Sequence, residues 1–297
     1  MKINFSKYFK ISNILSVIFF AVSILFILFK GLNYGIDFKG GTLFEIQTNK
    51  NISTLNIRDI LKNLQLGDVN VKNFGEKGNF LIKVEQTDNK QTIPLIKKSL
   101  LENLSDEVNF RRVEKVGPKV SSELLKSGII SICLALFAML FYIWIRFEWQ
   151  FSLGSIIALF HDVVITLGIF SLLSIEINLS IVAAVLTIVG YSMNDTVVIY
   201  DRIRENLSKY NRVNITEISD ISINETLSRT LITSVTTLLA LFSIFILGGE
   251  ILKGFSFAMI VGVFIGTYSS IFIASPVLKY LKVTSKTLEK KEDNIVP

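Results

Sequence analysis

Apolar residues along this chain are concentrated in six segments, each long enough to cross the roughly 30 Å hydrocarbon core of a bilayer as a helix. Four of the segments contain no histidine or charged residue, whereas the third contains His161 and Asp162 and the fourth contains Asp195. The segments run over approximately residues 11–29, 127–145, 149–175, 177–200, 230–248 and 254–278. The pattern predicts an α-helical polytopic membrane protein with six transmembrane helices.

The segment between the first two apolar runs, residues 30–126, has the pattern of a folded α+β domain. Apolar and polar residues alternate as in strands over about 42–48, 68–74, 80–85 and 108–116, and follow a helical spacing over about 54–64 and 92–104. The alternation in the last strand breaks at Arg111 and Arg112. The order βαββαβ predicts a ferredoxin-like fold. We find no catalytic set of residues in this domain and expect it to contact another protein or to act as a rigid spacer.

The basic residues of the short connections lie almost entirely on one side of the predicted membrane. The opposite side has only Lys253, whereas the side of the N-terminus has Lys2, Lys7, Lys10, Arg146, Arg202, Arg204, Lys209, Arg212, Arg229, Lys279, Lys282, Lys286, Lys290 and Lys291. The positive-inside rule therefore predicts cytoplasmic termini and an external domain. The expected organisation is a cytoplasmic N-terminus with the first helix (1–29), the external domain (30–126), a five-helix bundle (127–278) and a basic, disordered cytoplasmic tail (279–297).

Asp195 is the most informative polar residue inside an apolar segment. A carboxylate at the centre of a transmembrane helix costs about 2.5–3.5 kcal/mol on insertion scales, so it needs a partner or a function. Thr187, Tyr191 and Asp195 share one face of a helix, and Asn194 precedes the carboxylate. Asp195 is thus either a group in a proton relay or a structural carboxylate, paired with a cation or reaching cytoplasmic water.

Arg229 is the expected partner of Asp195. It begins a second polar stripe, with Thr233 and Thr236, in the fifth segment. If the fourth and fifth helices pack antiparallel, Arg229 and Asp195 lie at a similar depth. A neighbouring guanidinium favours the ionised form of a carboxylate, and its removal favours the protonated form. The pair therefore has the chemistry of a proton relay.

Three further sets of residues have weaker functional signals. His161 and Asp162 form an interhelical contact or a secondary relay; a metal site is not expected, because the chain has a single histidine and no ligand spacing. Small residues recur every fourth position in the sixth segment and indicate close helix packing. The segment after the first helix contains Asp and a glycine pair, typical of a turn or hinge. The residues concerned are Gly262, Gly266 and Ser270 for packing, and Asp37, Gly40 and Gly41 for the hinge.

Composition and missing motifs narrow the possible functions. The net charge of +6 is not arranged as basic residues interleaved with aromatic ones, so we do not expect nucleic-acid binding. The phosphate-binding loop and the common hydrolase motifs are missing from the sequence. We therefore expect no enzymatic activity and no cofactor, and any work must draw on an ion gradient or a partner.

Several motifs occurring in order give the chain its resemblance to a known family. They are residues 35–41 (GIDFKGG), His161-Asp162, residues 190–196 (GYSMNDT) running into 201–206 (DRIREN), residues 226–230 (TLSRT) and residues 266–270 (GTYSS). Over nearly its full length the chain resembles the SecF family of bacterial protein-export subunits.

This resemblance implies six helices forming half of an RND-type (resistance-nodulation-division) transporter, with a periplasmic ferredoxin-like domain. It implies pairing with SecD in the inner membrane to complete a twelve-helix unit, and action on preproteins leaving the SecYEG channel, driven by the proton-motive force. Asp195 and Arg229 match the charged positions that the family uses for proton transport. Two alternatives are a subunit of an RND-type small-molecule exporter and a structural scaffold of the translocon.

Overall fold

The computed structural model divides the chain into two compact units. One is a helical bundle built from the residues up to Asn33, Ser131–Glu176 and the residues from Ser180 onward; the other comprises Tyr34–Ile130 and Ile177–Leu179. The structure describes residues 3–48, 52–64, 66–67, 69–75, 77–85, 92–104, 108–210, 213–285 and 287. The end of the predicted C-terminal tail, residues 288–297, lies outside the described residues.

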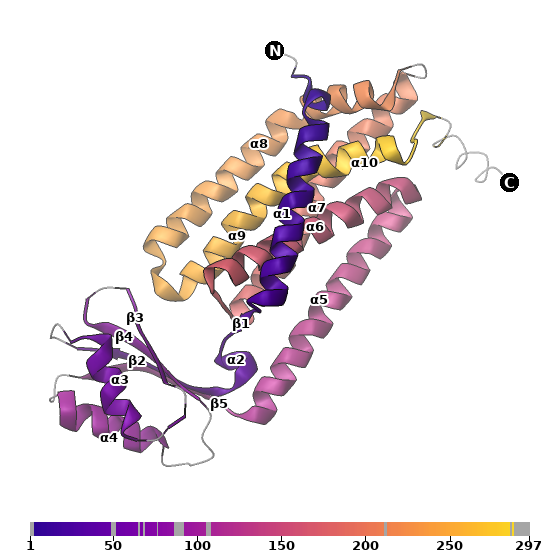
Figure 1. Ribbon diagram of the computed structural model, residues 1–297. Helices are drawn as coiled ribbons and strands as arrows, with labels where there is room; N and C mark the ends of the chain where they lie inside the picture. The colour runs from indigo at the N-terminus through magenta and orange to yellow at the C-terminus, as the bar shows by residue number, and fades with distance from the viewer. Residues whose placement is uncertain are drawn as a thin grey trace. The chain divides into compact units, whose positions relative to one another are not determined.

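Six helices in the described part of the chain are long and apolar enough to span a membrane, which confirms the predicted fold class (Figure 1). A short 3₁₀ turn, η1 (Phe5–Lys7), precedes the first of them, and the sixth is interrupted by a π-helical turn, η2. The elements are α1 (Phe9–Phe29), α5 (Pro118–Arg146), α6 (Trp149–Leu173), α7 (Leu179–Lys209), α8 (Ile215–Leu247) and α9 (Gly249–Ser269), continued by η2 (Ser270–Ala274) and α10 (Ser275–Tyr280).

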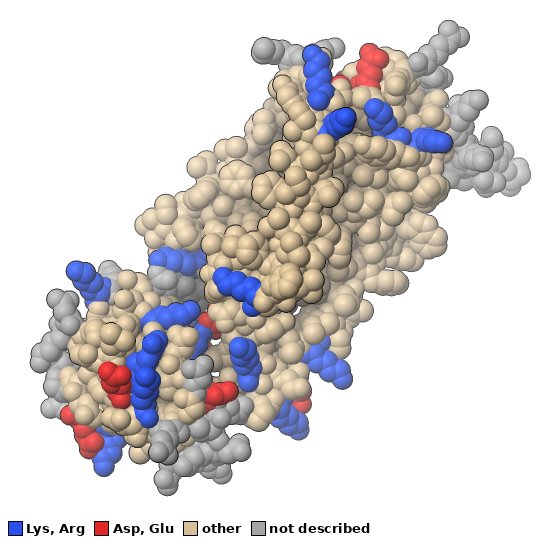
Figure 2. All heavy atoms as spheres, in the orientation of Figure 1, with Lys and Arg blue, Asp and Glu red and all other residues tan. Residues whose placement is uncertain are grey.

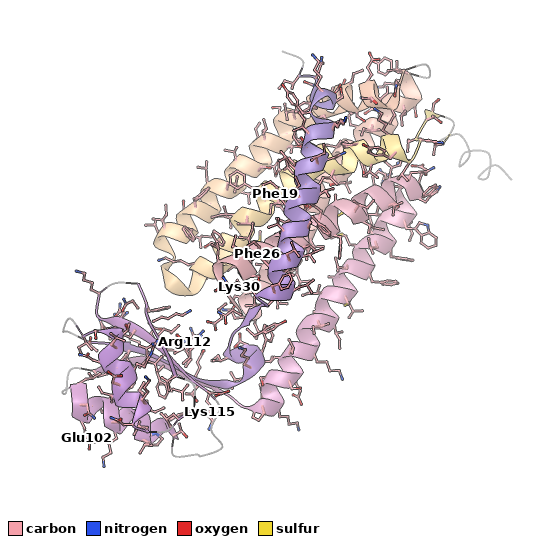
Figure 3. The ribbon with its side chains drawn as sticks, in the orientation of Figure 1. Phe19, Phe26, Lys30, Glu102, Arg112 and Lys115 are labelled. Atoms are coloured by element: carbon pink, nitrogen blue, oxygen red, sulfur yellow. The ribbon has the colours of Figure 1, made fainter. Side chains whose placement is uncertain are left out.

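Helices α6, α7 and α9 form the interior of the bundle. In their most apolar stretches 56%, 50% and 61% of the residues are buried, counting α10 with α9, against 17%, 11% and 17% in α1, α5 and α8. Figure 3 shows Phe19, Phe26 and Lys30 in succession along α1, and the visible side of this helix has no charged side chain between its two ends (Figure 2). The outer helices thus present apolar surface suited to lipid or to another membrane protein.

Helices α7 and α8 extend beyond the apolar segments that predicted them. The polar end of α7 is hydrogen-bonded to the polar start of α8. Arg202 Nε donates to Glu225 Oε2 at 2.6 Å, and Asn206 Nδ2 donates to Ser222 Oγ at 2.9 Å. Ser6 of η1 donates to Asp220 of α8 through both its backbone nitrogen and its hydroxyl. Hydropathy marks only the part of a helix that crosses the bilayer, so these polar continuations were not predicted.

The second unit contains a four-stranded antiparallel sheet with the order β3-β4-β2-β5. Its elements are α2 (Ile36–Lys39), β2 (Gly41–Gln47), α3 (Thr54–Lys62), β3 (Val69–Asn73), β4 (Asn79–Val84), α4 (Thr92–Leu104) and β5 (Asn109–Val116). Phe44, Ile57, Ile82 and Leu100 are among the side chains of its core, which joins the sheet to α3 and α4. This is the predicted ferredoxin-like βαββαβ arrangement.

The break in alternation at Arg111 has a structural cause. Glu45 of β2 pairs with Arg112 of β5, whereas the next residue, Ile46, pairs with Phe110, so the register shifts and Arg111 is the extra residue of a bulge. A bulge places two residues of one strand opposite one residue of its neighbour and interrupts the two-residue period. The Arg111 side chain donates to Gln47 Oε1 at 2.8 Å.

The glycine pair before β2 is required by the backbone. Gly40 and Gly41 have φ angles of 77° and 129°, and a β-carbon at Gly41 would lie 2.7 Å from the carbonyl oxygen of Val84 in the neighbouring strand. Asp37, in α2, accepts a hydrogen bond from the backbone nitrogen of Leu179, the first residue of α7, at 3.0 Å. The short strands β1 (Asn33–Tyr34) and β6 (Glu176–Ile177) form a second, two-stranded sheet.

Helices α7 and α9 approach closely at the small residues of α9. A β-carbon at Gly262 would lie 2.3 Å from Ile188 Cγ1, and one at Gly266 would lie 3.0 Å from Ser192 Cβ. The Ser270 hydroxyl instead turns back onto its own helix and donates to the carbonyl oxygen of Thr267. The close approach brings the polar groups of the two helices within reach of each other.

Gly262→Ala should destabilise the bundle, because the added methyl group overlaps Ile188 in a packed interface. Overpacking of this kind costs about 1–3 kcal/mol. We expect a lower midpoint of thermal unfolding for the detergent-solubilised protein and partial recovery in Gly262→Ala/Ile188→Ala. Gly190→Ala is the matched control, since a β-carbon there has no neighbour within 4 Å in the described part of the chain. Equal midpoints for the Gly262 variant and the control would contradict the packing described.

Candidate functional site

Asp195 lies where α7, α8 and α9 meet. Its side chain is buried, with 2% of its surface exposed, and Thr267 Oγ1 of α9 donates to Asp195 Oδ2 at 3.4 Å. The Thr267 hydroxyl also shares a 2.8 Å hydrogen bond with Ser234 Oγ of α8. The contact with Asp195 is long for a hydroxyl–carboxyl bond and therefore weak. Asp195, Thr267 and Ser234, which we call the Asp195 cluster, connect three helices through polar groups inside the bundle.

No lysine or arginine among the described residues forms an ion pair with Asp195. Arg229 lies on an exposed part of α8, where its carbonyl oxygen accepts a hydrogen bond from Thr233 Oγ1. The structure therefore places Arg229 close enough to act electrostatically on Asp195, without a direct ion pair. An ionised carboxylate without a cation is costly inside a membrane, so Asp195 is stabilised either by a proton or by a cation that approaches it.

Several polar side chains near Asp195 face outward from the bundle. Asn194 and Thr187 are exposed on α7, as Arg229 is on α8. The Tyr191 hydroxyl on α7 is buried and has no hydrogen-bond partner among the described residues. Exposed polar residues inside apolar spans are unfavourable against lipid, and they indicate that another protein or water covers this face.

Asp162 is the centre of a second polar cluster, which was less clearly signalled by the sequence. Its carboxyl group is fully buried in α6, and Oδ2 accepts hydrogen bonds from Ser192 of α7 at 2.6 Å and from Ser269 of α9 at 2.7 Å. His161 Nδ1 lies 2.9 Å from Asp162 Oδ1. We call Asp162, His161, Ser192 and Ser269 the Asp162 cluster; it joins α6, α7 and α9.

The hydroxyl groups of both clusters were missed as site residues by sequence reasoning. Ser192, Thr267 and Ser269 lie in the motifs that carried the family resemblance, but no spacing rule connects them to a carboxylate 30 to 107 residues away. Among the described residues, no group of three or more His, Cys, Asp or Glu side chains is placed to hold a metal ion. The two clusters are built from carboxyl, hydroxyl and imidazole groups that form hydrogen bonds across the helices.

Comparison with known proteins places the chain in a family. Residues 96–284 match the family described as protein export membrane protein SecD/SecF, C-terminal, and residues 25–52, which include Asp37 and the glycine pair, match the SecD/SecF GG motif. The protein translocase subunit SecF of Rickettsia rickettsii is 42% identical over 293 residues, which cover 97% of this chain and 95% of that protein. The chain belongs to the SecF family. Its membership confirms the resemblance and makes the chain a multi-pass membrane protein.

Other SecF relatives and two solved structures agree with this assignment. The SecF subunit of Cereibacter sphaeroides is 42% identical over 278 residues, covering 90% of this chain and 86% of that protein. The crystal structure of SecDF, a translocon-associated membrane protein from Thermus thermophilus, matches with a TM-score of 0.87 and 34% identity over 95% of this chain. SecDF in its super-membrane-facing form matches with a TM-score of 0.71 and 32% identity. This SecF-family chain spans 39% and 40% of the length of those SecDF chains.

Proposed function

We propose that this SecF-family chain pairs with a SecD subunit in the bacterial inner membrane and that the pair uses the proton-motive force to promote preprotein translocation and release through SecYEG. The observation that carries the proposal is Asp195, a carboxyl group buried between three helices with no cation bound to it among the described residues. Such a group can gain and lose a proton when its surroundings change. Relatives of this chain are named protein translocase subunits, which supports export as the work to which proton exchange is coupled.

In this proposal Asp195 is the proton-binding group and Arg229 controls its charge. When the guanidinium approaches, it favours the carboxylate and the proton leaves; when it withdraws, the carboxyl group takes up a proton. Asn194 is adjacent and exposed, and its side chain hydrogen-bonds to Asp195.

A SecD partner accounts for the exposed polar groups of α7 and α8. Thr187, Asn194 and Arg229 face outward from spans that otherwise meet lipid. The matched chains are named SecDF and are more than twice as long as this one. This supports a SecD subunit as the protein that covers the exposed polar groups. A purified chain that conducts protons alone as a stable monomer would contradict this pairing.

The proposal places both termini in the cytoplasm and residues 30–126 in the periplasm. The distribution of Lys and Arg supports this orientation. After replacement of Cys133, the only cysteine in the chain, a cysteine at Lys77 should react with a membrane-impermeant thiol reagent added from the periplasmic side, and a cysteine at Ser208 should not. Both positions are exposed in the structure, so failure to react reports location rather than burial. The reversed result would overturn the orientation.

The function itself is tested by measuring preprotein release into the periplasm with and without a proton gradient. A structural scaffold gives release that depends on the presence of the chain but not on proton exchange at Asp195. A proton-driven subunit gives release that is lost when Asp195 can no longer bind and release a proton.

A further inference from the structure

The Asp162 cluster contains a buried acid and a buried imidazole that the proposed relay at Asp195 does not use. Asp162 is fully buried and His161 is 6% exposed. Asp162 Oδ2 accepts from Ser192 and Ser269, while Oδ1 lies 2.9 Å from His161 Nδ1. Two hydroxyl donors and one imidazole therefore satisfy the carboxyl group without a Lys or Arg side chain.

The surroundings of the second ring nitrogen of His161 indicate which nitrogen of the neutral ring carries the proton. His161 Nε2 is buried and makes no hydrogen bond to any residue that the structure describes. In the neutral tautomer with the proton on Nδ1, the histidine donates to Asp162 and Nε2 is an unprotonated acceptor. Buried N–H groups without a partner are rarer in proteins than under-satisfied acceptors, which favours this tautomer. The network is thus consistent with a histidine ready to accept a proton at Nε2.

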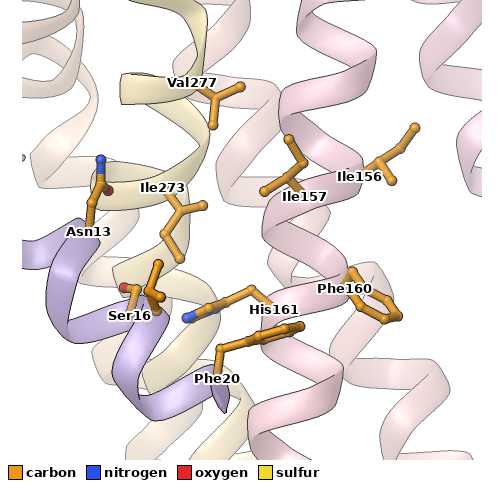
Figure 4. Close-up of a pocket in the computed structure, with 10 residues that line it drawn as sticks. Asn13, Ser16, Phe20, Ile156, Ile157, Phe160, His161, Ile273 and Val277 are labelled. Atoms are coloured by element: carbon orange, nitrogen blue, oxygen red, sulfur yellow. The ribbon is translucent and has the colours of Figure 1, made fainter. Parts of the chain in front are cut away.

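A pocket of about 430 Å³ lies beside His161, between α1, α6 and the η2–α10 segment. Figure 4 shows the imidazole reaching from α6 toward Ser16 and Phe20 of α1, and the Phe20 ring is stacked on it with an angle of 7° between the two planes. Most of the lining is apolar, and Asn13, Ser16 and His161 supply its polar groups. The His161 imidazole thus lies at the edge of an almost wholly apolar pocket, on the side of Ser16 (Figure 4).

We propose that His161 and Asp162 form a second proton-binding site, filled from the α1–α6 pocket and coupled to the Asp195 cluster through α7 and α9. A hydronium ion gives its proton to His161 Nε2 and remains as water. The proton on Nδ1 then moves to Asp162 Oδ1, which leaves a neutral carboxylic acid and a neutral histidine protonated at Nε2. The pair as a whole has bound one proton. This inference rests on the proposed proton-driven function.

The surroundings of the pair contain few other titratable groups. From α1 the pair meets Phe20 and Ser16, from α7 Ser192, and from α9 Ser269. The neighbouring titratable residues are Asp195, three positions after Ser192, and Tyr268, which hydrogen-bonds to Ser16 and to the Ser12 carbonyl oxygen of α1. Asp195 is therefore the acidic group with which the pair is expected to interact.

Coupling follows from the two helices that the clusters share. On α9, Thr267 binds Asp195 while Ser269 binds Asp162; on α7, Ser192 binds Asp162 and Asp195 follows within one turn. Gly266 brings α9 against Ser192 at this level, so the interface leaves little room for one cluster to rearrange alone. A proton that changes the hydrogen bonds of Asp162 therefore changes the position of groups that contact Asp195, and thermodynamic coupling between two sites acts equally in both directions.

The single histidine of the chain makes the test specific. The chain is labelled with ¹³C,¹⁵N-histidine, combined with unlabelled partner subunit in lipid, and studied by solid-state NMR across the range around the usual imidazole pKa of about 6.5. The ring-nitrogen shifts report the tautomer and the protonation of His161. We expect one step in which the proton moves from Nδ1 to Nε2. In Asp162→Asn this tautomer change should disappear, because an amide cannot take the Nδ1 proton.

Coupling is measured as a change in the midpoint of the same step. Asp195→Asn should shift it by about one pH unit, which equals about 1.4 kcal/mol of coupling. Asp201→Asn, the same substitution at an exposed position of α7, should leave it unchanged. If Asp162→Asn does not assemble, Ser269→Ala keeps both titrating groups, and it should also move the midpoint by removing one donor to Asp162.

Three results would overturn the inference. A His161 tautomer that is the same at every pH would eliminate the proton site. A tautomer change that survives in Asp162→Asn would eliminate the shared proton, and a midpoint unmoved by either Asp195→Asn or Ser269→Ala would eliminate the coupling. The measurement uses no export activity, so the loss of this second site and the failure of the proposed function at Asp195 can be told apart.

Discussion

Asp195→Asn should reduce gradient-driven preprotein release to the level of cells that lack the chain. Asparagine has nearly the size of aspartate and can still accept the hydrogen bond from Thr267, but it cannot exchange a proton. Insertion and assembly should be retained, because a neutral amide is less costly than a carboxylate in a membrane. The measurement is release of a labelled preprotein from inner-membrane vesicles or spheroplasts, with the gradient present or collapsed by an uncoupler.

Asp201→Asn is the matched control for this experiment. It makes the same chemical change on the same helix, at a side chain that is 45% exposed and pairs with Arg146. Exposed ion pairs contribute little, about 0–1 kcal/mol, so export should remain near the wild-type level. Gradient-dependent release that persists in an assembled Asp195→Asn protein would contradict a role of this carboxyl group in proton exchange.

Arg229→Met should have an effect of similar size by a different route. The substitution keeps an unbranched apolar stem but removes the guanidinium, so the positive charge that favours the ionised form of Asp195 is lost and the bound proton is not released. We expect an assembled complex with gradient-driven release at the background level, measured in the same assay. Arg146→Met, at an exposed arginine on α5, is the control and should retain release. Normal release by Arg229→Met would remove Arg229 from the mechanism.

The six helices could be predicted because each apolar segment is long and the connections are polar. The α+β unit could be predicted because alternating and helical patterns follow each other in a recognisable order, and its strands and helices occur in the predicted order βαββαβ. The lengths of α7 and α8 could not be predicted, since their ends are stabilised by pairs such as Arg202 and Glu225 rather than by burial in lipid. The bulge at Arg111 appeared in the sequence only as a break in alternation.

The candidate site was only partly visible in the sequence. A carboxylate in an apolar segment stands out because placing it in a membrane costs free energy, and this is why Asp195 and Asp162 could be found from the sequence. Their partners depend on how helices distant in sequence rotate against each other, and no periodicity encodes this. Thus Ser192 and Ser269 were not connected to Asp162, and Arg229, although placed at a similar depth by the sequence, lies on an exposed part of α8 without an ion pair to Asp195.

The Asp195→Asn/Arg229→Met double variant tests the central claim most directly. If the two residues are only a structural ion pair, each single variant leaves one unpaired charge, and neutralising both restores a stable protein and its function. If they are the proton relay, the double variant assembles but has no group to bind the proton. The deciding measurement is preprotein release by the assembled double variant with and without a proton gradient. We predict equal, background-level release under both conditions, and recovery of gradient-dependent release would contradict the relay.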